Sequence, residues 1–128
     1  MDDNRDRLVV ILAGYYDDMH NFLNKNAGLQ SRFPNIIEFE DYSTDELFSI
    51  AERMYKEQGY ILSSEAIELL GEIFEEGKKQ PQFGNGRYVR NIFEKSLNNQ
   101  AMRLSRSSTI GKAELSTIIA QDIKEVLA

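Results

Sequence analysis

The chain has 128 residues, of which 41% are hydrophobic and 28% charged, a balance typical of one soluble domain long enough to bury its own core. It contains no cysteine and one histidine, which excludes disulfide frameworks, thiolate metal sites and histidine-rich metal centres. The 15 basic and 21 acidic residues give a net charge of −6. That sign argues against a nucleic-acid partner or an anionic membrane bound by the whole surface.

No segment has the sequence of a membrane-spanning or secretory element. The longest uninterrupted apolar run, residues 8–13, is far shorter than the roughly 20 residues that a membrane-spanning helix needs. The N-terminus is acidic and polar, whereas a secretory signal is basic and then apolar. We therefore expect a cytoplasmic protein with no membrane partner.

The first forty residues have an α/β pattern. The β-branched apolar run at residues 8–13 predicts a strand covered on both faces of a parallel sheet. Residues 17–24 place apolar side chains at helical spacing behind two aspartates, and residues 35–39 predict a second short strand. Two strands and one helix do not make a stable layer, so we expect this segment to be the end of a larger domain.

Beyond residue 41 the apolar period changes to the 3.6 residues of a helix. The spacing Ser43-x-x-Glu46 is a capping box, and it predicts a first helix that ends near Gly59. Two further helices are predicted at 63–77, capped by Ser63 or Ser64, and at 87–106. The apolar stripes of the three helices are Leu47, Phe48, Ala51, Met54 and Tyr55; Ala66, Ile67, Leu70, Ile73 and Phe74; and Val89, Phe93, Leu97, Ala101 and Leu104.

A last apolar set lies between residues 115 and 127, and its spacing fits either one helix or two. The sequence therefore predicts a mainly α fold with a boundary near Asp41. Residues 1–41 are a short strand-helix-strand piece of an α/β core, and residues 42–128 form a four-helix bundle.

Two glycine-containing segments fail as phosphate-binding motifs. Residues 84–89, GNGRYV, have Val89 where a dinucleotide fingerprint needs its third glycine. Gly111-Lys112 lacks both the hydroxyl residue and the first glycine of a P-loop. Without a P-loop or an apolar strand ending in Asp-Glu, the chain has no phosphoryl-transfer machinery by itself.

Two arginines follow glycine-containing turns that could fix the positions of their side chains. Arg32 lies in residues 28–34, GLQSRFP, between the predicted helix and the second strand. Arg87 opens the third helix of the bundle directly after Gly-Asn-Gly. A planar, permanently charged guanidinium at such a turn is suited to recognising polyphosphate.

Three segments resemble, in order, motifs of the AAA+ ATPases of the CbxX/CfxQ type, the family of red-type rubisco activase and stage V sporulation protein K. Residues 4–15, NRDRLVVILAGY, resemble the sensor-1 strand of that family. Residues 28–35, GLQSRFPN, resemble its arginine-finger segment, and residues 84–91, GNGRYVRN, its sensor-2 motif. The resemblance implies that residues 1–41 end a nucleotide-binding domain, that 42–128 are the helical lid, and that Met1 is internal to a longer parent.

The resemblance also implies roles for individual residues. Arg32 would be the finger that reaches the ATP γ-phosphate of a neighbouring subunit, and Arg87 would be sensor 2 within its own subunit. Tyr15 lies in the sensor-1 region, where many AAA+ proteins have Asn or Thr. The parent would use ATP and Mg²⁺ in a hexameric ring that remodels a protein substrate. The chain alone would bind neither tightly and would be inactive.

The sequence also leaves open an alternative function of a different class. The chain could be a free-standing helical interaction module whose partner binds the exposed apolar strand and the bundle surface. That module would have no nucleotide chemistry.

Overall fold

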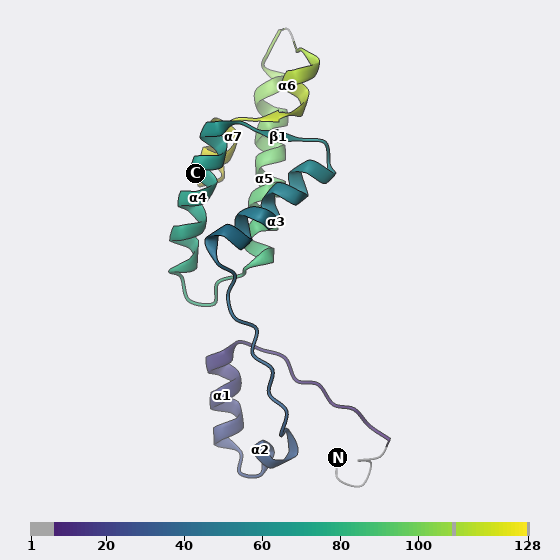
Figure 1. Cartoon of the computed structure of the whole chain (residues 1–128), viewed down its shortest axis with the longest axis vertical. Helices are drawn as coiled ribbons and strands as arrows, with labels where there is room; N and C mark the ends of the chain where they lie inside the picture. Colours follow the sequence, from purple (N-terminus) through teal and green to yellow (C-terminus); the bar gives the residue numbers. More distant parts are fainter. Residues whose placement is uncertain (1–6, 109, 128) are drawn as a thin grey trace. The chain divides into compact units, whose positions relative to one another are not determined.

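The computed structural model describes residues 7–108 and 110–127. The chain divides into two compact units, Met1–Glu40 and Asp41–Ala128. The mainly α fold predicted from the sequence is confirmed (Figure 1). Within the described ranges, no helix is long and apolar enough to cross a membrane, and no group of acidic, histidine or cysteine side chains could hold a metal ion.

The described part of the first unit, residues 7–40, contains two helices. α1 (Tyr16–Lys25) corresponds to the helix predicted at 17–24, and its Leu23 is buried. α2 (Leu29–Arg32) is a four-residue helix that the sequence pattern did not predict. It follows Gly28, whose φ of 93° lies in the left-handed region that glycine adopts most easily.

The strands predicted at 8–13 and 35–39 are wrong for this structure, because neither segment has strand conformation. A strand is stable only when its backbone groups pair with a neighbour, and the described residues of the first unit offer none. The side chains of Val9 and Ile11 are both 85% exposed. The apolar pattern is therefore present, but none of the residues that the structure describes pairs with this segment to form a sheet.

The second unit is built on three long helices, α3 (Thr44–Glu57), α4 (Ser64–Lys78) and α5 (Gly86–Ser105). The capping box is confirmed, because the Ser43 side chain accepts from the Glu46 N–H and the Glu46 carboxylate accepts from the Ser43 N–H. These bonds lower the pKa of Glu46. At α4 the cap is Ser63, which settles the choice between the two serines.

The C-terminal segment resolves the choice between one helix and two. It forms α6 (Lys112–Ser116), the strand β2 (Thr117–Ile118), α7 (Ala120–Lys124) and a 3₁₀ turn, η2 (Glu125–Leu127). The strand β1 (Ile61–Leu62), between α3 and α4, pairs in parallel with β2. The fourth helix of the predicted bundle is thus broken by a strand, because β2 pairs with the α3–α4 connection.

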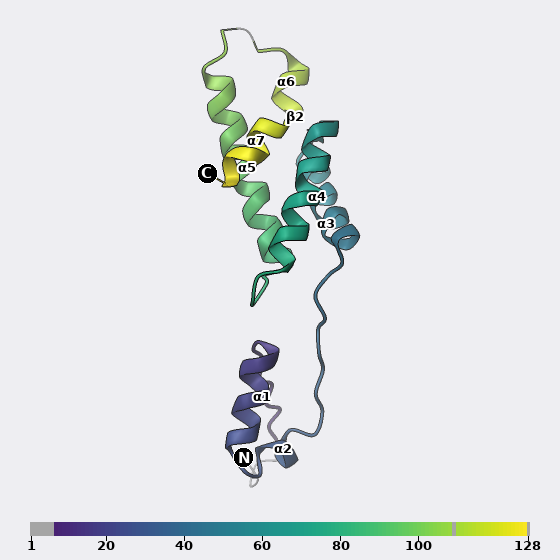
Figure 2. The same cartoon turned by 90° about the vertical axis from the view of Figure 1, so that its left-hand side faces the viewer.

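The core lies among α3, α4, α5 and α7 (Figure 2). α3 packs against α4 and α5, and α7 packs against the same two helices. The Tyr55 and Phe93 rings meet edge to face, with centroids 4.9 Å apart. Ile67 and Ala101 are exposed, so their assignment to the apolar stripes is wrong. The fully buried core side chains are Leu47, Ala51, Tyr55, Ala66, Leu70, Phe74, Val89, Ile118 and Ile123.

Polar side chains of α5 fasten the C-terminal segment. The buried Gln100 amide donates to the carbonyls of Glu114, Leu115 and Thr117 at 3.0–3.3 Å. Arg103 binds both carboxylate oxygens of Asp122, at 2.9 and 3.1 Å. Buried polar groups are stable only when they are paired in this way, so these contacts specify where the segment docks.

Asp122→Ala should lower the free energy of unfolding by about 3 kcal/mol, because it leaves a partly buried guanidinium without its partner. The Asp122 side chain is 1% exposed and also accepts from the Ile119 N–H. The matched control is Arg53→Ala, which breaks an exposed ion pair with Glu57 and should cost less than about 1 kcal/mol. Urea unfolding measures the free energy of unfolding of both variants. Equal losses in Asp122→Ala and Arg53→Ala would contradict a stabilising role for the Arg103–Asp122 pair.

Burial raises the pKa of Tyr55 to about 12, and the nearby Asp122 carboxylate acts in the same direction. The phenol bonds Ser96 Oγ at 2.6 Å, and Ser96 Oγ itself donates to the Phe93 carbonyl. The folded protein therefore keeps this phenol protonated at pH values where the unfolded chain, with a pKa near 10, has lost the proton.

The stability that Tyr55 contributes should be fully present below about pH 10 and disappear as the pH rises to about 12. The expected loss is about 3 kcal/mol, which urea unfolding at a series of pH values can measure. Tyr55→Phe should show a shallower decline over this interval, since its ring cannot ionise. A parallel decline in both proteins would refute the role of Tyr55.

Candidate functional site

Arg32 ends α2, and the chain holds the position of its backbone closely. Its N–H donates to the Gly28 carbonyl at 3.3 Å, and the Ser31 hydroxyl donates to the same carbonyl at 2.8 Å. Pro34 follows two residues later and cannot continue the helix. The guanidinium is therefore presented from an exposed corner rather than from a long helix face.

Tyr15 is the residue before α1, and its carbonyl accepts from the Met19 N–H at 2.8 Å. Its ring is half exposed. Tyr15 precedes α1, whereas α2, which Arg32 ends, lies beside the far end of α1 (Figure 1). The structure therefore does not bring these two residues together. Residues 4–6 of the sensor-1-like segment lie outside the described residues.

Arg87 belongs to the second unit and stands in the first turn of the 20-residue α5. Residues 84–87 form a tight turn, in which the Arg87 N–H donates to the Gly84 carbonyl at 3.0 Å. Asn85 in this turn has φ 52° and ψ −119°, the conformation of the first central residue of a type II′ turn. The side chain of Arg87 is exposed.

Asn85 is a site residue that the sequence reasoning missed. Its side-chain oxygen accepts from the Tyr42 N–H at 2.9 Å, and its amide nitrogen donates to the Asp41 carboxylate at 2.8 Å and to the Phe83 carbonyl at 3.2 Å. The available signal was an asparagine between two glycines, because asparagine tolerates positive φ and hydrogen-bonds nearby backbone.

Tyr88 packs the start of α5 against the end of α4. The centroids of the Tyr88 and Phe83 rings are 5.0 Å apart. The Tyr88 ring also lies directly over Gly77, in the space that a Cβ atom would occupy. Burial raises the pKa of Tyr88. The turn that carries Arg87 is thus braced on one side by Tyr88 and on the other by Asn85.

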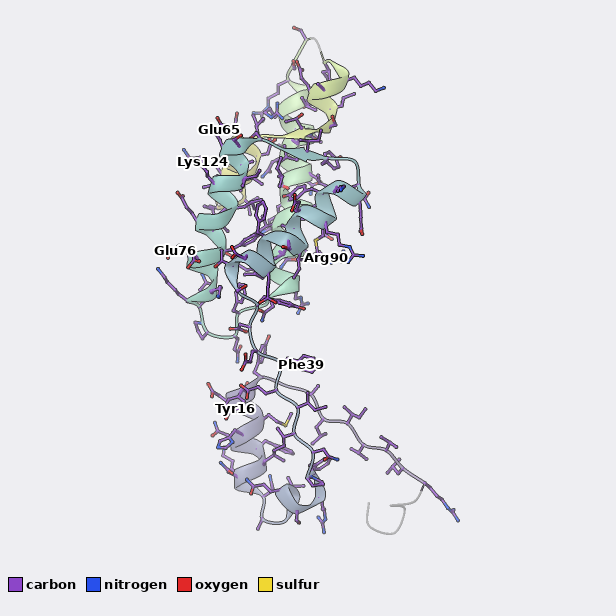
Figure 3. The ribbon with its side chains drawn as sticks, in the orientation of Figure 1. Tyr16, Phe39, Glu65, Glu76, Arg90 and Lys124 are labelled. Atoms are coloured by element: carbon purple, nitrogen blue, oxygen red, sulfur yellow. The ribbon has the colours of Figure 1, made fainter. Side chains whose placement is uncertain are left out.

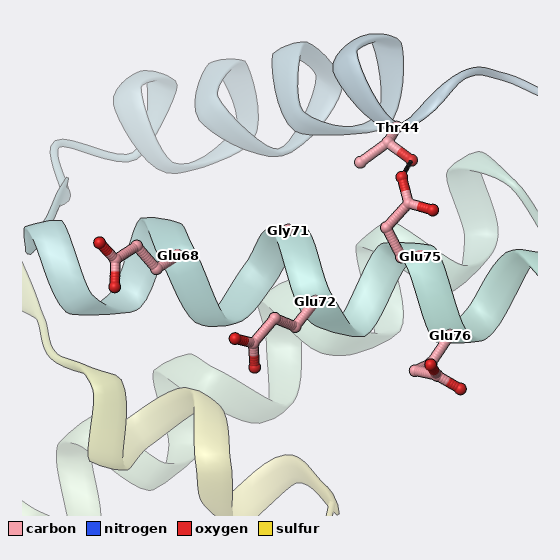
Figure 4. Close-up of a pocket in the computed structure, with 6 residues that line it drawn as sticks. All are labelled: Thr44, Glu68, Gly71, Glu72, Glu75 and Glu76. Atoms are coloured by element: carbon pink, nitrogen blue, oxygen red, sulfur yellow. Dashed lines mark hydrogen bonds between the residues drawn. The ribbon is translucent and has the colours of Figure 1, made fainter.

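An acidic groove lies between the start of α3 and the exposed face of α4 (Figure 4). Thr44 Oγ1 donates to the Glu75 carboxylate across it. Carboxylates repel polyphosphate, so this groove is not a nucleotide site. Its lining residues are Thr44, Glu68, Gly71, Glu72, Glu75 and Glu76.

Two alanine substitutions in α4 test the packing of Tyr88. A Cβ at Gly77 would lie 2.6 Å from Cζ of Tyr88, whereas a Cβ at Gly71 meets nothing within 4 Å. Gly71→Ala should raise the free energy of unfolding by up to about 1 kcal/mol, the difference in helix propensity. Gly77→Ala should lack this gain and shift the Tyr88 ring signals in an NMR spectrum. A gain equal to that of Gly71→Ala, with unchanged ring signals, would refute the contact.

Residues 43–128 match the family model described as the AAA lid domain. Stage V sporulation protein K from Bacillus subtilis (strain 168) is 45% identical over 126 residues, which are 96% of this chain and 39% of that protein. A CfxQ homolog from Pyropia yezoensis is 44% identical, over 96% of this chain and 42% of the homolog. Protein CbbX from Cereibacter sphaeroides is 43% identical, over 97% of this chain and 41% of CbbX.

The chain therefore spans about two fifths of the length of these relatives. The similarity extends over both units, because it covers nearly all of this chain, whereas the lid-domain match lies within the second unit. The chain belongs to the AAA+ ATPases of the CbxX/CfxQ type and carries their lid domain at residues 43–128.

Proposed function

We propose that this chain completes the ATP-hydrolysis sites of an AAA+ ring, with Arg32 as the arginine finger and Arg87 as sensor 2. The observation that carries the proposal is the placement of Arg87 in the first turn of α5, exposed, within the lid domain. The N-terminal end of a long helix carries a partial positive charge, which adds to that of the guanidinium in attracting phosphate.

Arg32 supports the proposal in a different way. Its backbone is held at the end of α2 while its side chain is exposed, so the guanidinium can extend toward a second molecule. A planar guanidinium binds two phosphate oxygens at once and stabilises the charge that develops as the γ-phosphate leaves. Arginine fingers contribute on the order of 10³ to 10⁵ in turnover.

We propose that residues 1–41 are the last part of the nucleotide-binding α/β domain. Val9, Ile11 and Phe39 are 85–91% exposed, and Figure 3 shows Phe39 extending away from the backbone. Such apolar side chains are expected where further strands and helices cover them. The P-loop and the acids that hold Mg²⁺ would lie in that larger domain, and Tyr15 would face the nucleotide from its sensor-1 segment.

The proposed partners are neighbouring subunits of the same ring and a protein substrate. One relative, 38% identical over 125 residues, is a chloroplastic ribulose bisphosphate carboxylase/oxygenase activase from Cyanidioschyzon merolae. We propose a substrate of the same general kind, a folded protein assembly that lid movement remodels, and we place the protein in the cytoplasm. We prefer this proposal to a free-standing interaction module because the chain matches the AAA lid domain and its relatives over both units.

The proposal can be tested in a hybrid protein in which residues 1–128 replace the matching part of stage V sporulation protein K from Bacillus subtilis. Arg32→Ala should lower ATP turnover about 10³-fold or more while ATP still binds, because the finger serves the neighbouring site. Arg87→Ala should lower turnover and also weaken ATP binding within its own subunit. Steady-state turnover and equilibrium binding of a fluorescent ATP analogue measure the two effects.

A mixing experiment separates the two arginines. Subunits with Arg32→Ala keep an intact nucleotide site, so adding subunits whose P-loop lysine is replaced should restore part of the turnover. The matched control is Arg90→Ala, an exposed arginine one turn further along α5 (Figure 3), which should leave turnover unchanged. If each of the two single variants, Arg32→Ala and Arg87→Ala, kept full ATP turnover, the assigned roles would be rejected.

A further inference from the structure

The side chain of Asn85 joins two segments that are more than forty residues apart in sequence. On one side are Asp41 and Tyr42, the first residues of the second unit, where the chain arrives from the first. On the other is the turn at residues 84–87, which carries Arg87. The two bonds to Asp41 and Tyr42 are 2.8 and 2.9 Å long, and the one to Asp41 is charge-assisted.

The Asn85 side chain makes these contacts instead of the helix-capping hydrogen bond that its position before α5 favours. It is the N-cap residue of α5, where an asparagine side chain ordinarily accepts from the N–H groups of the first helical turn. Here the side chain makes no such cap. The backbone conformation that turns it away has positive φ, which is costly for a residue with a Cβ and persists only when other contacts compensate.

We propose that Asn85 is a positioning residue that couples the entry of the lid unit, residues 41–42, to the turn that carries Arg87. A displacement of Tyr42 changes the direction of the Asn85 amide, and with it the first turn of α5. The entry segment and Arg87 then move as one body. The inference deepens the proposed function, because it gives sensor 2 a mechanical connection to the point where the two units join.

The coupling can be measured by NMR in the 128-residue chain without any nucleotide. Asn85→Gly removes all three side-chain bonds, while glycine readily adopts the backbone conformation of this turn. Hydrogen exchange of the Tyr42 amide should accelerate roughly fivefold to tenfold. The order parameter of the Arg87 Nε–H group and that of its backbone amide should fall in the same variant.

Exchanging the side chains of residues 85 and 41 should restore the coupling that the single substitution at residue 85 removes. Asn85→Asp alone keeps an acceptor for Tyr42 but places a second carboxylate against Asp41, so it should loosen both Tyr42 and Arg87. Adding Asp41→Asn restores a donor opposite that carboxylate and should return both signals toward their original values. Asp41→Ala, which leaves the turn itself unchanged, should loosen both to a smaller degree. The matched control is Asn91→Ala, an exposed asparagine further along α5, which should change neither signal.

The proposal is overturned if the Tyr42 amide exchanges freely in the unaltered protein. It is also overturned if Asn85→Gly accelerates exchange at Tyr42 while the Arg87 signals keep their order parameters, or if the exchanged pair of side chains restores one residue and not the other. None of these readouts depends on ATP. Failure of the coupling and failure of Arg87 as a phosphate ligand are therefore distinguishable.

Discussion

The second unit depends on the line of polar contacts that α5 makes along its buried face. Ser96 holds the Tyr55 phenol of α3, Gln100 holds three carbonyls of the C-terminal segment, and Arg103 holds Asp122. Each contact satisfies a group that would otherwise be buried without a partner. Apolar burial gives the unit its free energy, but these directional bonds determine which segments meet α5 and in what register.

This arrangement gives α5 a second role at its other end. A helix fixed by contacts from Ser96 to Arg103 is a rigid rod over its 20 residues, so the position of its first turn is set by the core. Arg87 therefore needs no ion pair of its own to be placed. The packing of Tyr88 over Gly77 and the hydrogen bonds of Asn85 then determine how the first turn of α5, which carries Arg87, is oriented.

The parts of the fold that follow local rules could be predicted from the sequence. The capping box at Ser43 and the period of α3 identified that helix, because both depend on residues within a few turns of one another. Ser96 and Gln100 were missed, since a polar residue gives no apolar signal and its partners lie elsewhere in the chain. The strand predicted at residues 8–13 failed for a related reason: apolar pattern indicates burial, but pairing requires a partner that the described residues do not supply.

The candidate site shows the same division between local and distant information. Arg32 and Arg87 were chosen as candidates because short motifs surround them, and hydrogen bonds of nearby residues hold the backbone at both positions. Asn85 stands in one of these motifs, but its contacts with Asp41 and Tyr42 join positions that no spacing rule connects. In the proposed function, Arg32 and Arg87 act from separate units, which residues 40 and 41 connect. The bonds of Asn85 lie where that chain enters the lid, and this single side chain acts on the first turn of α5, which carries Arg87.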